Sequence, residues 1–287
     1  MPELPEVEIV KQSLEKKVKY KVIRDIIINN PNLRYKIQKN FKKNIINKKI
    51  INIRRRSKYI IINLENNIFL IIHLGMSGTL HYLEKNSKNL NSNLSFYHSP
   101  KLPNKHNHIE FYFPDFKIIY NDPRRFGFLK IINSKNELKN YFNKKGPEPF
   151  DKFFSQEYFK KKIKKKKKNI KNLLLDQNFV SGIGNIYASE ILFYSKINPL
   201  KKGNDITKKE IKKIIRYSRL VLNKAIKKGG SSIKNFKDFQ GNEGSYQKEF
   251  KVYGKKGENC PSKNCKEKIV KLNISKRSTY VCNICQK

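Results

Sequence analysis

Apolar residues recur at helical spacing near the start of the chain. Val7, Val10, Leu14 and Val18 are separated by 3, 4 and 4 positions, which predicts a helix over 6–18 with one buried stripe. Short runs of β-branched and aromatic residues then predict strands, because these side chains suit a half-buried pleated surface. Many short strands joined by brief turns are typical of a sandwich or barrel. The predicted strands cover 22–28, 50–53, 59–64, 68–74, 109–113, 116–120 and 126–132.

The polar, Ser- and Asn-rich stretch 86–105 predicts a mobile loop, and the pattern becomes helical from about residue 134. The glycine and prolines of 146–149 predict a hinge. Thr207 and Glu210 have the spacing of a capping box and predict the start of a long helix, which Gly229 and Gly230 end. Its expected inner face consists of Ile211, Ile214, Ile215, Ser218, Leu222 and Ala225.

The net charge of +41 indicates a polyanionic partner, of which nucleic acid is the commonest. Lys, Asn and Ile are abundant throughout, however, and genomic drift toward A and T produces the same excess, so charge alone leaves both readings open. No apolar run approaches the length of a transmembrane helix. The start MPELPEVE lacks the basic and apolar regions of a signal peptide, so we expect a cytoplasmic protein.

All four cysteines lie near the end of the chain, in two close pairs. Cys260 and Cys265 are separated by four residues, and Cys282 and Cys285 by two. Such pairs let four thiolates converge on one tetrahedral Zn²⁺, and cytosolic proteins seldom form the competing disulfides. The segments 269–272 and 279–281 are strand-like around a polar turn. We therefore predict a zinc ribbon whose single ion is structural, because all its ligand positions are filled.

The first residues offer a candidate nucleophile. Removal of Met1 would expose Pro2 as a secondary amine, and an ordinary α-amine titrates near about 7.7–8.0. The neutral amine can attack a carbon and form an iminium, and the adjacent Glu3 can move protons. Most chains that begin in this way have an inert terminus, so the dipeptide does not decide by itself.

Four further motifs each allow two interpretations. The turn 182–185 lies between two predicted helices, with Asn185 the expected cap of the second, and is either a phosphate site or a plain turn. Met76, in the turn after strand 68–74, either packs or wedges into a base stack. Arg124 and Phe126 suit either a hairpin turn or phosphate contact with stacking. The lysines of 160–168 are typical of a solvated helix face, with phosphate binding the second reading.

Together these motifs resemble the formamidopyrimidine-DNA glycosylase family, bacterial enzymes that remove 8-oxoguanine and ring-opened purines. The resemblance implies an α+β fold of two domains: an N-terminal β-sandwich with flanking helices, and a helical helix–two-turn–helix domain with a zinc-ribbon hairpin. The first cysteine pair departs from the family's usual spacing of two residues. We place the domains at 1–134 (catalytic sandwich), 135–150 (hinge), 151–249 (helical, DNA-binding) and 250–287 (zinc ribbon). The matching motifs are P-E-L-P-E-V-E, R-x-S-K-Y-I, H-L-G-M-S-G, K-H-N-H, D-P-R-R-F-G, G-P-E-P, G-I-G-N-I-Y-A-S-E and V-Y-G-K-K-G.

The resemblance also implies a bifunctional glycosylase and abasic-site lyase acting as a monomer on double-stranded DNA with a damaged base, and no membrane partner. Pro2 is implied as the nucleophile and Glu3 as the proton donor to the sugar. Lys58 is implied as a proton donor or phosphate contact in β-elimination, and Arg277 as acting in δ-elimination and binding a phosphate. The implied residues that fill the vacated stack are Met76, Arg124 and Phe126. The implied DNA contacts are His106, Arg124, Lys166 and Asn185. The polar region 231–246 is implied to cap the flipped base.

Two alternatives remain at the level of the sequence. An endonuclease VIII-type glycosylase for oxidised pyrimidines shares the terminal Pro-Glu and the zinc ribbon, although the L-P-E-V-E continuation favours the purine enzyme. A non-catalytic, basic zinc-ribbon protein that binds nucleic acid would explain the charge and the cysteines. It would not explain Pro2 and Glu3 together with Lys58 and Arg277.

Overall fold

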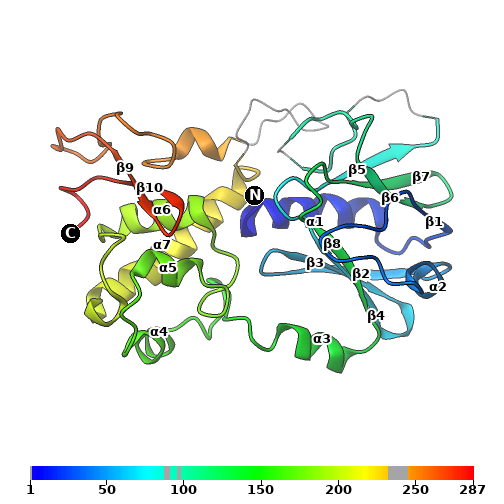
Figure 1. Ribbon diagram of the computed structural model, residues 1–287, viewed down its shortest axis with the longest axis horizontal. Helices are drawn as coiled ribbons and strands as arrows, with labels where there is room; N and C mark the ends of the chain where they lie inside the picture. Colours follow the sequence, from blue (N-terminus) through cyan, green and yellow to red (C-terminus); the bar gives the residue numbers. More distant parts are fainter. Residues whose placement is uncertain (1, 87–90, 96–97, 232–244) are drawn as a thin grey trace. The chain divides into compact units, whose positions relative to one another are not determined.

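The structure is a computed structural model that describes residues 2–86, 91–95, 98–231 and 245–287 (Figure 1). The chain forms two compact units. The first, here the N-unit, comprises Met1–Asn143 and Ile226–Gln247; the second, the C-unit, comprises Lys144–Ala225 and Lys248–Lys287. Among the described residues, no helix is long and apolar enough to cross a membrane.

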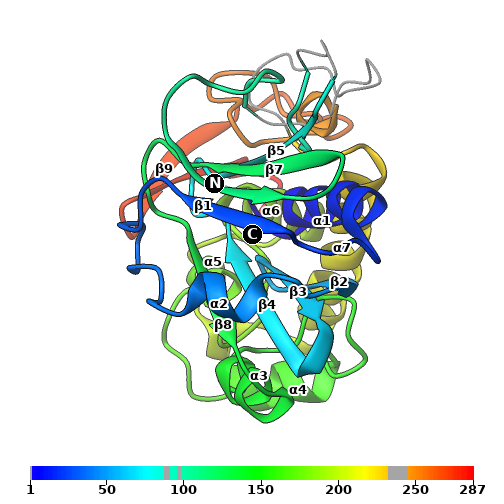
Figure 2. The same cartoon turned by 90° about the vertical axis from the view of Figure 1, so that its right-hand side faces the viewer.

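The N-unit is a β-sandwich with flanking helices. Its two four-stranded antiparallel sheets form separate layers (Figure 2). The first sheet has the order β1 (Asp25–Ile28), β6 (Asn107–Tyr112), β7 (Phe116–Asn121) and β5 (Thr79–Glu84). The second has the order β2 (Ile50–Arg56), β3 (Tyr59–Leu64), β4 (Ile68–His73) and β8 (Phe128–Ile132). Three shorter elements complete the unit: α2 (Phe41–Ile45), η1 (Glu65–Asn67) and α3 (Lys135–Phe142).

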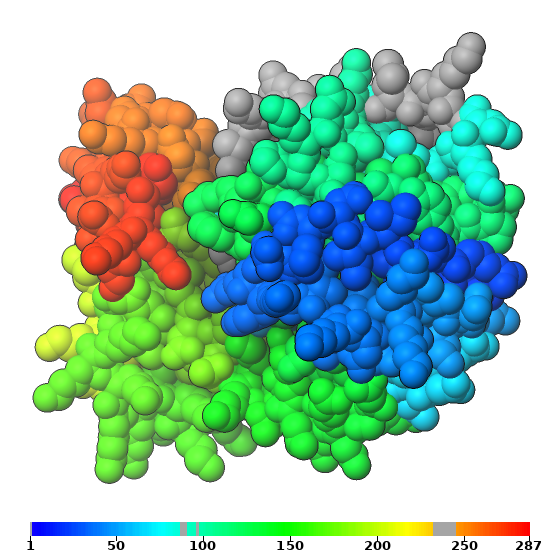
Figure 3. Space-filling model, turned by 45° about the vertical axis from the view of Figure 1, so that its right-hand side comes forward, coloured from blue at the N-terminus to red at the C-terminus, as the bar shows by residue number. Residues whose placement is uncertain are grey.

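One continuous core joins the two sheets and helix α1 (Leu4–Val18). The predicted stripe from Val7 to Val18 is buried and contacts the inner faces of both sheets, including Ile62 and Phe111. The space-filling view shows the blue N-terminal residues packed directly against the cyan and green residues of the later strands (Figure 3). The opposite face of the second sheet has a smaller apolar cluster, where α3 covers Phe69.

The C-unit is helical and ends in a two-stranded hairpin. The capping box at the start of α7 forms as predicted: Thr207 N donates to Glu210 Oε2 over 2.8 Å, and Glu210 N to Thr207 Oγ1 over 3.3 Å. The predicted inner face of α7 is buried throughout. The elements are α4 (Gln156–Ile163), α5 (Ile170–Leu175), α6 (Asn185–Ser195), η2 (Gly203–Asp205), β9 (Val270–Ile274) and β10 (Arg277–Val281). Two more, α7 (Lys208–Lys227) and η3 (Tyr246–Glu249), cross the boundary between the two units.

Sequence patterns missed or misjudged three local features. Strand β5 was not predicted, because two of its buried residues, Thr79 and His81, are polar. The stretch 86–105 is not uniformly loose: in its described part, Ser92, Asn93 and Ser95 are buried, and Asn93 bridges to His81 of β5. Asn185 is not a helix cap; Gly184 occupies that position and Asn185 is the first residue of α6.

His81 generates a prediction on acid stability. Its ring is buried between Thr79 and Ser92, and burial, helped by nearby His98, lowers its pKa to about 4. As pH falls from about 6.5 to about 4, His81 therefore binds a proton in the unfolded chain but stays neutral in the folded chain. Stability should fall by up to about 3 kcal/mol across that window and level off below it.

Urea denaturation at pH 7 and pH 5 tests this expectation. His81→Gln should flatten the loss of stability between the two pH values, whereas His106→Gln, at an exposed histidine, should leave it as in the wild type. An unchanged pH dependence in His81→Gln would show that other groups control acid unfolding.

Candidate active site and metal centre

The buried carboxylate of Asp122 joins two loops of the N-unit, the one between β4 and β5 and the one between β7 and β8. It accepts hydrogen bonds from the Ser77 hydroxyl in the first loop and from Gly127 N, over 2.8 Å, in the second. Backbone contact is so close that a Cβ on Gly75 would lie 2.3 Å from Gly127 N. The two loops therefore hold a fixed position relative to each other.

This junction presents the three residues implied to fill a vacated base stack. Met76 and Phe126 are 37% and 44% exposed, which is unusual for large apolar side chains and leaves them available for contact. The guanidinium of Arg124 lies 4.6 Å from the centre of the Phe126 ring, a cation–π arrangement. Arg124 N donates to Ser77 Oγ over 3.2 Å, so all three side chains project from one hydrogen-bonded platform.

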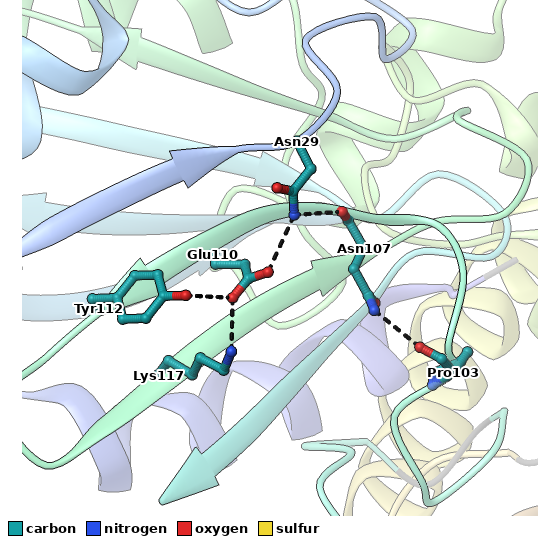
Figure 4. Close-up of polar contacts among 6 residues, drawn as sticks. All are labelled: Asn29, Pro103, Asn107, Glu110, Tyr112 and Lys117. Carbon is teal, nitrogen blue, oxygen red and sulfur yellow. Dashed lines mark hydrogen bonds and ion pairs between the residues drawn. The ribbon is translucent and has the colours of Figure 1, made fainter. Parts of the chain in front are cut away.

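The residue that follows His106, Asn107, belongs to a polar network on the first sheet (Figure 4). Asn107 Nδ2 donates to Pro103 O over 2.9 Å, and Asn29 Nδ2 donates to Asn107 O over 3.0 Å. On the other side, Asp122 N donates to His106 O over 3.1 Å. These bonds fix a backbone in which His106 has a φ of 69° and an exposed side chain.

Pro2 and Glu3 are buried at the start of α1, where Glu6 fixes the chain. Glu6 Oε2 accepts from Glu3 N over 2.9 Å. Glu6 Oε1 accepts from both Ser231 N and Ser231 Oγ over 2.8 Å. The same carboxylate thus holds the first residues and the end of the segment that follows α7. Most of the region 231–246, implied to cap the flipped base, lies outside the described residues.

Lys58 lies in the two-residue turn between β2 and β3, where Ser57 has a φ of 57°. Its side chain is buried, which is uncommon for lysine. Arg55 bonds to Glu8 of α1 over 2.7 Å and to Ser57 O over 3.0 Å. An ion pair therefore ties the turn that carries Lys58 to the helix that begins after Pro2 and Glu3.

Arg277 is exposed at the first position of β10, and two residues of the C-unit brace its neighbour. Lys171 Nζ and Asn185 Nδ2 both donate to Ser278 O, over 3.1 and 2.9 Å. The side chain of Asn185, implied as a DNA contact, is thus directed to the hairpin. Lys166 is exposed in the connection between α4 and α5, and its carbonyl accepts from Asn204 N over 3.0 Å.

The four cysteines converge as a metal site requires. Their sulfurs lie within 4.8 Å of one another, and the Cys260–Cys285 and Cys265–Cys282 sulfur pairs are each 3.7 Å apart. A tetrahedral ion with metal–sulfur bonds of about 2.3 Å requires sulfur separations near 3.8 Å, whereas a disulfide requires about 2 Å. The residues therefore fit a bound metal ion. The four-residue spacing of the first pair is accommodated by Asn264, which has a φ of 62°.

Glu190 connects the helices to the cysteine-bearing segment, a role that the sequence motif around it did not reveal. Its fully buried carboxylate accepts from the backbone N–H groups of Lys251, Val252 and Tyr253, over 2.8 to 3.0 Å. Burial raises the pKa of Glu190, while these bonds oppose the rise. The sequence signal was an acidic residue within an otherwise apolar helix.

The predicted residues thus fall into two sets. The N-unit carries Pro2, Glu3, Lys58, Met76, His106, Arg124 and Phe126, and the C-unit carries Lys166, Asn185, Arg277 and the four cysteines. Within each set, buried carboxylates or amides fix the backbone that bears the predicted side chains. Asp122, Glu6, Glu190 and Lys171 are the supporting residues that were not assigned from the sequence.

Comparison with known proteins gives full-length matches. Residues 1–129 match the model of the formamidopyrimidine-DNA glycosylase N-terminal domain, and residues 145–237 the model of the H2TH domain of the same enzymes. The chain is 43% identical to formamidopyrimidine-DNA glycosylase of Wolbachia sp. subsp. Brugia malayi over the whole of both chains.

Solved structures of Lactococcus lactis Fpg are similar over their whole length. The complex with abasic-site DNA matches with a TM-score of 0.87 and 35% identity, covering 99% of each chain. The complex of the wild-type protein with DNA containing N7-benzyl-Fapy-dG matches with a TM-score of 0.87 and 36% identity, covering 100% of each chain.

The cysteine cluster predicts that removing a bound metal unfolds the hairpin region first. Cys265→Ser should lose the metal and expose the backbone amides of 250–287 to hydrogen exchange, because metal binding is coupled to local folding. Asn283→Ser changes an exposed residue between two of the cysteines and should behave as wild type. Metal content by mass spectrometry and exchange rates provide the measurement; equal protection in both variants would argue against a structural metal.

Proposed function

Because the chain belongs to the formamidopyrimidine-DNA glycosylase family, the DNA glycosylases of base-excision repair, we propose that it removes oxidised purines and then cuts the strand as an abasic-site lyase. The observation that carries the proposal is the fixed position of Pro2 and Glu3 at the start of α1 in a chain that matches the family from end to end. The proposed substrate is double-stranded DNA with 8-oxoguanine or a formamidopyrimidine.

The exposed platform of Met76, Arg124 and Phe126 supports recognition of a flipped base. A glycosidic bond cannot be reached inside the stack, so the damaged nucleotide must leave the duplex. Apolar and cationic side chains that enter the space left behind offset part of the cost of unstacking. Asp122 holds the platform rigid, which avoids a further entropic cost on binding. We propose that His106 of the N-unit and Lys166 and Asn185 of the C-unit also contact the DNA.

The proposed chemistry begins at Pro2 after Met1 has been removed, because within the chain its nitrogen is an amide and not a nucleophile. The free amine attacks C1′, the bond from C1′ to the base breaks, and the base leaves with its electron pair. Glu3 protonates the sugar ring oxygen, and the ring opens to an iminium between Pro2 and C1′. Glu6 supports this step by holding Glu3 N over 2.9 Å.

Strand cleavage follows from the acidity that the iminium gives to the C2′ proton. Loss of that proton expels the 3′ phosphate in β-elimination, and loss of a further proton expels the 5′ phosphate in δ-elimination. We assign Lys58 to the first elimination, because it is buried on the turn tied to α1. We assign Arg277 to the second, where its exposed guanidinium can bind the leaving phosphate.

Zinc is the ion that best suits the cysteine cluster. Four thiolates with sulfur separations of 3.7 Å match the structural zinc sites of small hairpins. With four protein ligands the ion has no position for a substrate, so its contribution is to hold β9 and β10 and thereby Arg277. The reaction itself depends on the residues of the chain.

A lesion panel tests the proposal. Zinc-loaded protein lacking Met1 should release 8-oxoguanine and formamidopyrimidines and leave a one-nucleotide gap, with little action on undamaged duplex. Glu3→Gln should slow base release by about 10²–10⁴-fold, the usual contribution of a general acid. Glu15→Gln, further along α1, is the control and should match wild type.

Two results would replace this assignment. Preference for an oxidised pyrimidine would indicate an endonuclease VIII-type specificity. Binding without release of any base would indicate a nucleic-acid-binding protein without glycosylase activity.

A further inference from the structure

A cationic hollow lies on the outer face of the second sheet, and none of the residues assigned above is in its lining. It is open to solvent, has a volume of about 660 Å³ and lies between the edge strand β2 and helix α3. Its floor is apolar and includes Ile61, Phe69 and Phe142. A hollow of this volume is within the range of protein ligand sites.

Two pairs of cations, one on β2 and one on α3, line the hollow. Arg54 and Arg56 are two positions apart on β2 and pair with Ile61 and Tyr59, which belong to the outer apolar cluster. Residues directly opposite in antiparallel strands share a face, so both arginines lie on the outer face. Lys135 and Lys139 also line the hollow and are one turn apart on α3.

No acidic side chain is among the described residues that line the hollow. Arg55 also borders it, but its guanidinium is bound to Glu8. Arg54, Lys135 and Lys139 are exposed cations that line this one open hollow, an arrangement that an anion from outside would stabilise.

The presence of arginine argues against genomic drift as the complete explanation of the positive charge in this hollow. Lysine dominates the basic residues of this chain, with 54 lysines against ten arginines, yet three of those arginines are consecutive on β2. Arginine differs from lysine in its planar set of donors, which matches phosphate oxygens in pairs. Amide side chains of Asn52, Asn63 and Asn143 add further polar groups to the lining.

We propose that this hollow binds the phosphodiester backbone of DNA outside the lesion-binding face. The proposal rests on the proposed function, because the ligand is the DNA that the enzyme repairs. Arg56 directly precedes the turn that carries Lys58, so the cations of β2 continue along the edge of the sheet from the proposed active site. Such contacts carry no sequence information and increase affinity for any duplex.

The salt dependence of binding to a 40-base-pair undamaged duplex tests the proposal. Each phosphate contact with B-DNA contributes about 0.9 to the slope of log Kobs against log salt. Arg54→Gln combined with Lys139→Gln should therefore reduce the slope by about 1.8. Lys16→Gln combined with Lys43→Gln removes the same charge from exposed positions of the N-unit and should reduce it much less.

Cleavage of a lesion duplex under saturating, single-turnover conditions separates this proposal from the proposed function. The Arg54/Lys139 variant should retain the wild-type cleavage rate, since neither residue belongs to the proposed active site. Equal slopes in the two double variants would overturn the proposal. A wild-type protein that binds DNA but never cleaves it would instead contradict the proposed function and leave the slope test valid.

Discussion

The carboxylate of Glu6 is the constraint on which the proposed active site depends. A nucleophile at the end of a chain occupies the part of a protein that normally frays. Here Glu6 is buried and accepts from Glu3 N and from both donors of Ser231. These hydrogen bonds therefore fix the first turn of α1 to the residues before it and to the chain that follows α7. Without the hydrogen bonds to Glu6, Pro2 would have to be ordered at each encounter with substrate, at an entropic cost.

The same arrangement recurs at two further functional segments. This chain has only 23 acidic residues against 64 basic ones, yet it buries some of them as acceptors of backbone N–H groups. Glu6 holds the terminus, Asp122 holds the loops of Met76 and Phe126, and Glu190 holds the segment leading to the cysteines. A buried carboxylate is stable only when its oxygens are satisfied, so each of these sites specifies one local backbone. Surface positions, in contrast, tolerate lysine without such partners. There, the spatial arrangement of the basic residues is what distinguishes charge with a function from charge that arose by genomic drift.

Periodicity predicted the fold well where one face of an element is apolar. The stripe of α1, the inner face of α7 and strands β3, β4 and β7 were predicted correctly to within a residue or two. Strand β5 was missed because His81 is a polar residue buried by tertiary contacts. The capping assignment of Asn185 was wrong because the residue was judged from its type, whereas its amide bonds to a strand distant in sequence.

The candidate site was recognisable from the sequence only through the family resemblance, because Pro2, Glu3, Lys58 and Arg277 are each unremarkable alone. Their supporting residues could not be assigned, since Glu6, Asp122 and Lys171 act through partners between 45 and 225 positions away. The hollow beside β2 was equally inaccessible, because its two walls come from β2 and α3, which are separated in the sequence. The roles assigned to individual residues stay predictions.

The most direct test of the account is to trap the covalent intermediate. Zinc-loaded protein lacking Met1 would be incubated with a duplex carrying 8-oxoguanine opposite cytosine, reduced with borohydride, digested and analysed by mass spectrometry. Borohydride converts an iminium to a stable amine, so the account predicts one cross-linked peptide, modified at Pro2, and a lower yield in Pro2→Gly, whose terminal amine is primary. Cross-linking to a lysine instead, or cleavage at the wild-type rate by Pro2→Gly, would contradict it.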